Sequence, residues 1–206
     1  MYTTLPNALT LSRIVAIPLL VAAFWLPHPA DNWAAAGIFA AASVTDYFDG
    51  YFARRWGQIS RLGRFLDPIA DKLLVAAALM LLVAFHGIEG LTILPAILVM
   101  CREILVSGLR EFLAQINVGM PVSALAKWKT GIQMVAIGIL LVGDAGPAAI
   151  PVQLIGEIGL WIAAALTLIT GYDYLRAGLE HMAEPPPLAK GAQKAPDSTL
   201  TPRRVP

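Results

Sequence analysis

Six long apolar segments constrain this chain more than any other feature of its sequence. A spanning helix needs about 20 mostly apolar residues. Segments of this kind occupy residues 8–26, 34–53, 65–86, 91–112, 127–143 and 151–174. Only 14% of the residues are charged, whereas soluble domains carry about 25%. The sequence therefore predicts an all-α, polytopic membrane protein with six transmembrane helices.

The positions of Lys and Arg predict how the chain is oriented. Basic residues favour the cytoplasmic loops of membrane proteins. The loops after the first, third and fifth segments, "PHPADN", "HGIEG" and "GDAGPAA", contain no Lys or Arg. The other side carries Arg54, Arg55, Arg61, Arg64, Arg110, Lys127, Lys129 and Arg176. We therefore expect both termini to face the cytoplasm, in the inner membrane of a bacterium.

The C-terminal end differs in composition from the rest. Its sequence, "PPPLAKGAQKAPDSTLTPRRVP", is rich in Pro and small polar residues and has little apolar surface to bury. We predict a membrane domain over residues 1–182 and a disordered cytoplasmic tail over residues 183–206.

Four aspartates stand close together in the stretch "TDYFDGYFARRWGQISRLGRFLDPIADKLL". Asp46 and Asp49 are three positions apart, and Asp67 and Asp71 are four apart, so each pair shares one face of a helix. The connector "RRWGQISRLG" is short enough for the two helices to pack antiparallel. Four like charges would repel each other, and charges at membrane depth are costly. Two divalent cations, Mg²⁺ or Mn²⁺, would remove both difficulties.

The residues around these aspartates suit a diphosphate. Gly50, Ala53 and Gly63 allow a ligand to approach the backbone, and Arg54 supplies a cation for phosphate. Packing alone explains a single intramembrane aspartate but not four at these spacings. A cation channel or transporter is a further alternative, although transport sites usually lie near the middle of the bilayer. Prenyl-diphosphate enzymes also use facing acidic helices, but they are soluble.

The pattern Asp46-x2-Asp49-Gly50-x2-Ala53-Arg54-x8-Gly63-x3-Asp67-x3-Asp71 resembles, position for position, the signature of the CDP-alcohol phosphotransferase family. The resemblance implies a membrane enzyme that transfers a substituted phosphoryl group from a CDP-linked donor to an alcohol and releases CMP. It also implies a homodimer.

The resemblance assigns roles to the eight residues of the signature. Asp46, Asp49 and Asp67 would bind one metal, and Asp46, Asp67 and Asp71 a second. Asp71 would also be the general base. The CDP moiety would be held by Gly50, Ala53, Arg54 and Gly63.

Three other stretches, "PNALTLSRI", "REILVSGLREFL" and "KWKTGIQMVA", resemble bacterial members that act on CDP-diacylglycerol and sn-glycerol 3-phosphate. The implied products are phosphatidylglycerophosphate and CMP. The aspartates serve the shared donor, so a phosphatidylserine, phosphatidylinositol-phosphate or cardiolipin synthase remains an alternative.

Binding glycerol 3-phosphate needs cations beyond the metals. Arg110 is the first candidate, and Lys127, Arg102 and Lys129 are the others. Two alternatives stay open. The lysines would fit the membrane interface, with the charged end in water, and Arg102 would fit a pairing with Glu103 or Glu157.

Overall fold

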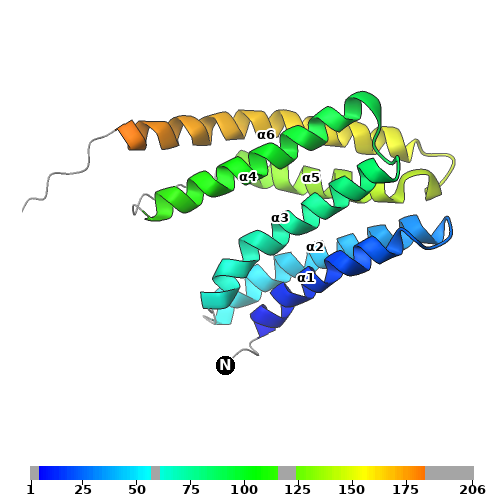
Figure 1. The fold of residues 1–206 in the computed structure, drawn as a ribbon, viewed down its shortest axis with the longest axis horizontal. Coiled ribbons are helices and arrows are strands. Elements are labelled where there is room, and N and C mark those ends of the chain that lie inside the picture. Colours follow the sequence, from blue (N-terminus) through cyan, green and yellow to red (C-terminus); the bar gives the residue numbers. More distant parts are fainter. Residues whose placement is uncertain (1–4, 57–60, 116–123, 184–206) are drawn as a thin grey trace, which may run out of the picture.

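The computed structural model describes residues 5–56, 61–115 and 124–183, and within these ranges the chain is helical with no strand (Figure 1). For some of these residues, among them 46–56, 61–65 and 67, only the helical backbone is described. The six α-helices are α1 (Leu5–Ala23), α2 (Ala30–Trp56), α3 (Arg61–Ala84), α4 (Ile93–Gln115), α5 (Ala124–Val142) and α6 (Val152–Ala183). Two 3₁₀ turns, η1 (Gly90–Thr92) and η2 (Gly143–Ala145), precede α4 and follow α5.

The six helices coincide with the six apolar segments, which confirms the all-α prediction. Three stretches of the described chain, Gly90–Gln115, Leu125–Ala145 and Val152–Arg176, are long and apolar enough to cross a bilayer, and Thr10–Ala23 is a shorter apolar helix. The protein is therefore a multi-pass membrane protein. The predicted domain boundary falls next to the end of α6, and residues 184–206 lie outside the described part of the chain.

One predicted loop is largely helical. The sequence "RRWGQISRLG" was expected to connect the second and third helices, but α2 continues to Trp56 and α3 begins at Arg61. Arg, Trp and Leu all tolerate a helix, and the first strong helix breaker after Asp49 and Gly50 is Gly57. Arg54, Arg55, Arg61 and Arg64 therefore belong to helix ends, and the connector shrinks to residues 57–60, which are not described.

The helices form two groups that meet along α5. In Figure 1, α1, α2 and α3 lie together, α4 and α6 lie together, and α5 packs against both α6 and α2. Large apolar side chains fill the space between the groups, among them Phe39, Leu74, Leu82, Ile137 and Leu140. Many outward-facing side chains are also apolar, as expected where the solvent is lipid.

The loops at one end of the bundle are tied to helix ends by side-chain amides. The Nδ2 atom of Asn32 donates to the carbonyl oxygens of Leu141 and Val142, both at 3.1 Å. These carbonyls belong to the last turn of α5, where the helix itself offers no partner. Gln153 Nε2 donates to the Gly87 oxygen at 2.7 Å. This end carries the loops without Lys or Arg, so the orientation proposed from the sequence places it outside the cytoplasm.

That orientation predicts which positions react with a membrane-impermeant thiol reagent applied to intact cells. In a Cys101→Ser background, cysteines replacing the exposed residues Glu89 and Ala148 should be labelled, because both lie in loops that lack basic residues. Cysteines replacing Gln115 and Ser198 should be labelled only after the membrane is opened. If only Gln115 and Ser198 were labelled in intact cells, the orientation of the protein would be the reverse of the one proposed.

Candidate active site

The four aspartates of the signature lie on two consecutive helices. Asp46 and Asp49 stand in the second half of α2, and Asp67 and Asp71 in the first half of α3. The backbone is helical through all four positions, so the spacing does place each pair on one helix face. The side chains of Asp46, Asp49 and Asp67 lie outside the described ones, as do Gly50, Ala53, Arg54 and Gly63. Their predicted contacts stay predictions.

The arrangement of these helices fits a pair of divalent cations. Only residues 57–60 separate α2 from α3, so the end of one helix and the start of the next lie together in Figure 1. Both aspartate pairs are therefore near the same end of the bundle. Carboxylate oxygens are the ligands that Mg²⁺ and Mn²⁺ prefer. The chemistry of the donor set and its placement on the backbone agree with the metal sites that the family resemblance implies.

Asp71 is the member of the quartet whose side chain is described. It lines a small cavity of about 40 Å³ between α3, α4 and α5. Lys72, Glu103, Thr130 and Gln133 are the other polar residues of its lining. The predicted general base therefore borders a space enclosed by three helices.

A larger cavity of about 380 Å³ lies next to this one, between α3 and α4. Its polar lining consists of Lys72, Arg102, Glu103, Ser107, Arg110 and Glu111. Lys72 and Glu103 line both cavities, so the two spaces are neighbours. The three basic side chains make this larger cavity suitable for a phosphate, since guanidinium groups bind phosphate oxygens with charge-assisted hydrogen bonds.

Several polar residues of these cavities were not among the candidates named from the sequence, and two of them are Lys72 and Gln133. Lys72 directly follows Asp71, and its Nζ donates to the Pro68 oxygen at 2.9 Å. Gln133 lies in the apolar sequence of α5 and is only 2% exposed. The signal for both was a polar residue inside a spanning segment, where such residues are costly and usually functional.

Arg102 is held in place by residues of α4 and α6. Its Nη2 donates to Thr170 Oγ1 at 2.9 Å, and its Nη1 lies 3.4 Å from Glu103 Oε1. The guanidinium carbon also lies 5.7 Å from the centre of the Tyr174 ring. The alternative pairing with Glu103 is therefore present, and Arg102 still lines the larger cavity. Glu157, the other partner considered, instead accepts a hydrogen bond from Gln153 Nε2 at 3.0 Å.

Lys129 is buried and paired. Its side chain is 2% exposed, and its Nζ forms an ion pair with Glu103 Oε1. Glu103 thus joins α4 to α5 while it also faces Arg102. Lys129 does not line the larger cavity, so a direct role in binding a phosphate stays a prediction.

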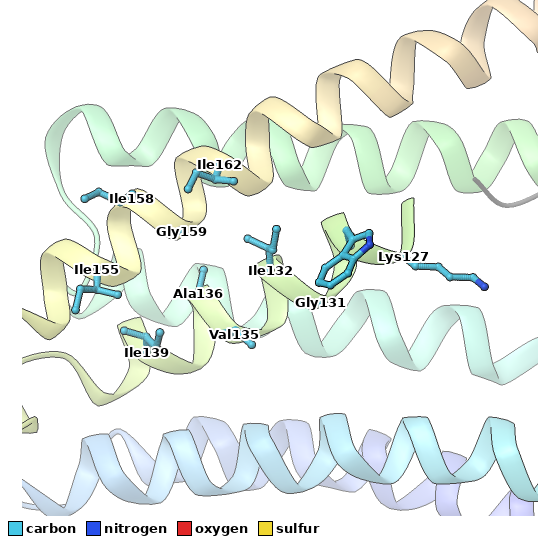
Figure 2. Close-up of a pocket in the computed structure, with 11 residues that line it drawn as sticks. Lys127, Gly131, Ile132, Val135, Ala136, Ile139, Ile155, Ile158, Gly159 and Ile162 are labelled. Carbon is cyan, nitrogen blue, oxygen red and sulfur yellow. The ribbon is translucent and has the colours of Figure 1, made fainter. Parts of the chain in front are cut away.

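Lys127 lies elsewhere. It lines one end of an apolar groove of about 840 Å³ between α5 and α6, together with Trp128 and a row of isoleucines (Figure 2). The four basic residues expected to bind glycerol 3-phosphate therefore do not all line one cavity. Arg102 and Arg110 share a cavity, Lys129 pairs with Glu103 without lining that cavity, and Lys127 lines a separate groove.

Comparison with known sequences identifies relatives over most of the chain. The family described as CDP-alcohol phosphatidyltransferase matches residues 3–169. A CDP-diacylglycerol–glycerol-3-phosphate 3-phosphatidyltransferase of Rickettsia bellii (strain RML369-C) is 49% identical over 173 residues, which are 84% of this chain and 94% of the relative.

Comparison with solved structures shows the same fold in a Mycobacterium tuberculosis phosphatidylinositol phosphate synthase. Its complex with manganese and citrate has a TM-score of 0.58 and 17% identity, over 83% of this chain and 82% of that chain. The form with CDP-DAG bound has a TM-score of 0.59 and 19% identity, over 82% and 85%. At these identities the likeness concerns the fold alone.

The buried pair between Lys129 and Glu103 predicts a specific pattern of stability. Lys129→Met should lower the stability of the folded protein by on the order of 3 kcal/mol, because it leaves the Glu103 carboxylate partly buried with weaker compensation. The double variant Lys129→Met/Glu103→Gln should recover much of that loss, since it removes both charges. Unfolding in detergent, followed by circular dichroism, measures this. Equal stability of the wild type and Lys129→Met would show that the pair is unimportant.

Proposed function

Because this chain belongs to the CDP-alcohol phosphatidyltransferase family, we propose that it transfers the phosphatidyl group of CDP-diacylglycerol to sn-glycerol 3-phosphate. The products are phosphatidylglycerophosphate and CMP, and the enzyme serves phospholipid synthesis. The relative from Rickettsia bellii carries the name of this reaction and is 49% identical over 94% of its own length. The observation that carries the acceptor assignment is the cavity lined by Lys72, Arg102 and Arg110 next to Asp71.

The reaction forms one phosphorus–oxygen bond and breaks another. A primary hydroxyl oxygen of the acceptor attacks the phosphorus that bears the diacylglycerol. The bond from that phosphorus to the bridging oxygen of the diphosphate breaks, and CMP leaves with the electron pair. Asp71 takes the hydroxyl proton, and a general base of this kind contributes roughly 10²–10⁴-fold to the rate. Its place on the small cavity allows it to reach an alcohol there.

Two divalent cations, when bound, would offset the charge of the diphosphate and of the departing CMP. We propose that Asp46, Asp49 and Asp67 hold the first, and Asp46, Asp67 and Asp71 the second. Gly50, Ala53, Arg54 and Gly63 would receive the CDP moiety. The helical register of the four aspartates and the short connection between α2 and α3 support these roles.

The acceptor phosphate needs positive charge of its own, because the metals already face the diphosphate. Arg102 and Arg110 come from α4, and Lys72 comes from α3. Glu103 lines the same cavity, but its carboxylate is paired with Lys129. Three cations therefore face one remaining carboxylate, that of Glu111. This balance favours an anionic acceptor over serine or an unphosphorylated alcohol.

Further features of the enzyme follow from the family and from the charge distribution. We propose that it is a homodimer in a bacterial inner membrane and that its active site faces the cytoplasm, where glycerol 3-phosphate is available. Among the described residues, Arg54, Arg55, Arg61, Arg64 and Arg110 belong to the end of α2, the start of α3 and the end of α4, which lie at the end of the bundle that carries the aspartates (Figure 1). This distribution supports the orientation.

Metal dependence is the first test of this function. CMP release by purified protein should stop in excess EDTA and return with Mg²⁺ or Mn²⁺, because the diphosphate needs charge compensation. Asp46→Asn, Asp49→Asn and Asp67→Asn should each lower turnover by about two orders of magnitude or more. Asp173→Asn, at an exposed aspartate of α6 that lines neither cavity, is the matched control and should keep full activity. Undiminished turnover in excess chelator would exclude the metal assignment.

The acceptor site gives a second test. Arg110→Ala should raise the KM for glycerol 3-phosphate by one to two orders of magnitude, where each factor of ten corresponds to about 1.4 kcal/mol. Lys72→Met should act in the same direction. Arg110→Lys should recover part of the loss, since it keeps the charge but loses the planar fork. The KM for CDP-diacylglycerol serves as the internal control and should hardly change.

The acceptor assignment fails under either of two results. One is a normal KM for glycerol 3-phosphate in the double variant Arg110→Ala/Lys72→Met. The other is a panel of acceptors in which the wild-type enzyme releases CMP faster with serine or inositol phosphate than with glycerol 3-phosphate.

A further inference from the structure

The buried side-chain oxygen of Gln133, in α5, has no role in the function proposed so far. The side chain of Gln133 is 2% exposed, and its Oε1 has no hydrogen-bond partner among the residues that the structure describes. Leaving a buried acceptor unsatisfied costs about 1–3 kcal/mol. Within a membrane domain, lipid supplies no hydrogen bond to compensate. Such a group calls for an explanation.

The place of Gln133 suggests one. It lines the same small cavity as Asp71. Two neighbouring polar groups in this lining are already engaged, because the Thr130 hydroxyl donates to the Ala126 oxygen at 3.1 Å and Glu103 is paired with Lys129. The amide oxygen of Gln133 is therefore placed to accept a hydrogen bond from a ligand that enters beside Asp71.

The size of the cavity indicates what part of a ligand would enter. Its volume is about 40 Å³, which exceeds the roughly 10–15 Å³ that a cavity needs to hold one water molecule. A small polar group such as a hydroxyl-bearing carbon therefore has room there. The larger cavity, which shares Lys72 and Glu103 with this one, has room for the phosphate of the same molecule.

We propose that Gln133 is a positioning residue that accepts a hydrogen bond from the second hydroxyl of the acceptor alcohol, the one that is not phosphatidylated. The proposal rests on the function proposed above. In sn-glycerol 3-phosphate the phosphate lies against Arg102 and Arg110, the C1 hydroxyl meets Asp71, and the C2 hydroxyl donates to Gln133. The hydrogen bond from the C2 hydroxyl to Gln133 directs the C1 hydroxyl toward Asp71. It also selects for acceptors that carry a hydrogen-bond donor at C2.

A substrate that lacks only the C2 hydroxyl, 3-hydroxypropyl phosphate, tests this directly. The wild-type enzyme should prefer glycerol 3-phosphate over this analogue by about tenfold in kcat/KM, which corresponds to about one hydrogen bond to a buried acceptor. In Gln133→Met the activity with glycerol 3-phosphate should fall by about the same factor. Activity with the analogue should not change, so the preference disappears.

Two further measurements separate positioning from packing. Met134→Leu, at the next residue of the same cavity lining, is the matched control and should keep the wild-type preference. Gln133→Met should melt no lower than the wild type in detergent, because it removes a buried acceptor that has no partner among the described residues. If Gln133→Met does not fold, Gln133→Asn replaces it. Asn has the same amide on a side chain that is one methylene shorter, so this variant should also lose the preference for glycerol 3-phosphate.

Each other outcome overturns the proposal. If a Gln133 variant loses activity equally with both acceptors, the residue acts on packing and not on the C2 hydroxyl. If the wild type uses both acceptors equally well, the C2 hydroxyl is not recognised. If the wild type releases CMP with neither acceptor but does so with another alcohol, the proposed function itself has failed.

Discussion

The part of the protein that we propose binds the acceptor depends on charges buried among α4, α5 and α6. Lys129 pairs with Glu103, and Glu103 faces Arg102, whose guanidinium donates to Thr170 and lies beside the Tyr174 ring. Charges within membrane-spanning segments are costly unless they are paired. The network therefore fixes how the three helices pack, and the packing in turn fixes where Arg102 can point. At Gly171 an added side chain would approach Arg102 Cγ to 3.1 Å, so α6 leaves room for the arginine.

The same network sets the charge of the larger cavity. Without Lys129, the Glu103 carboxylate would oppose an incoming phosphate. With it, Lys72, Arg102 and Arg110 would face the phosphate that we propose binds there. In the proposed function the two helix groups have different roles. α2 and α3 would supply the aspartates for the metals and the diphosphate, and α4 would supply two cations for the acceptor. Asp71 lines the small cavity between α3, α4 and α5.

The sequence predicts much of this arrangement because two of its signals are strong. Hydropathy identifies the six helices, and the aspartate spacing identifies the donor chemistry. The end of α2 was missed because the residues that follow Gly50 do not break a helix until Gly57. The four basic residues proposed for the acceptor were grouped because the fourth and fifth helices bring them toward one end of the bundle, which does not fix the direction in which each side chain points. Lys127 and Lys129 are two positions apart and so point about 200° away from each other on a helix, and one faces a groove while the other is buried.

Lys72 and Gln133 show which feature of the site could not be predicted from the sequence. Each is a polar residue in a largely apolar helix, and its role depends on the rotation of that helix against its neighbours. Packing between helices sets this rotation, and one sequence does not reveal it. Only the placement of α3 and α5 against α4 brings both residues to cavities beside Asp71.

The central claim is that metals and acceptor phosphate occupy adjacent sites at one end of the bundle. An experimental structure of the protein soaked with Mn²⁺ and glycerol 3-phosphate, with anomalous scattering recorded at the manganese edge, tests it most directly. The account predicts manganese between α2 and α3 at Asp46, Asp49, Asp67 and Asp71. It also predicts the phosphate within hydrogen-bond distance of Arg102 and Arg110. A phosphate bound beside Lys127 in the α5–α6 groove, or manganese away from the aspartates, would contradict the account.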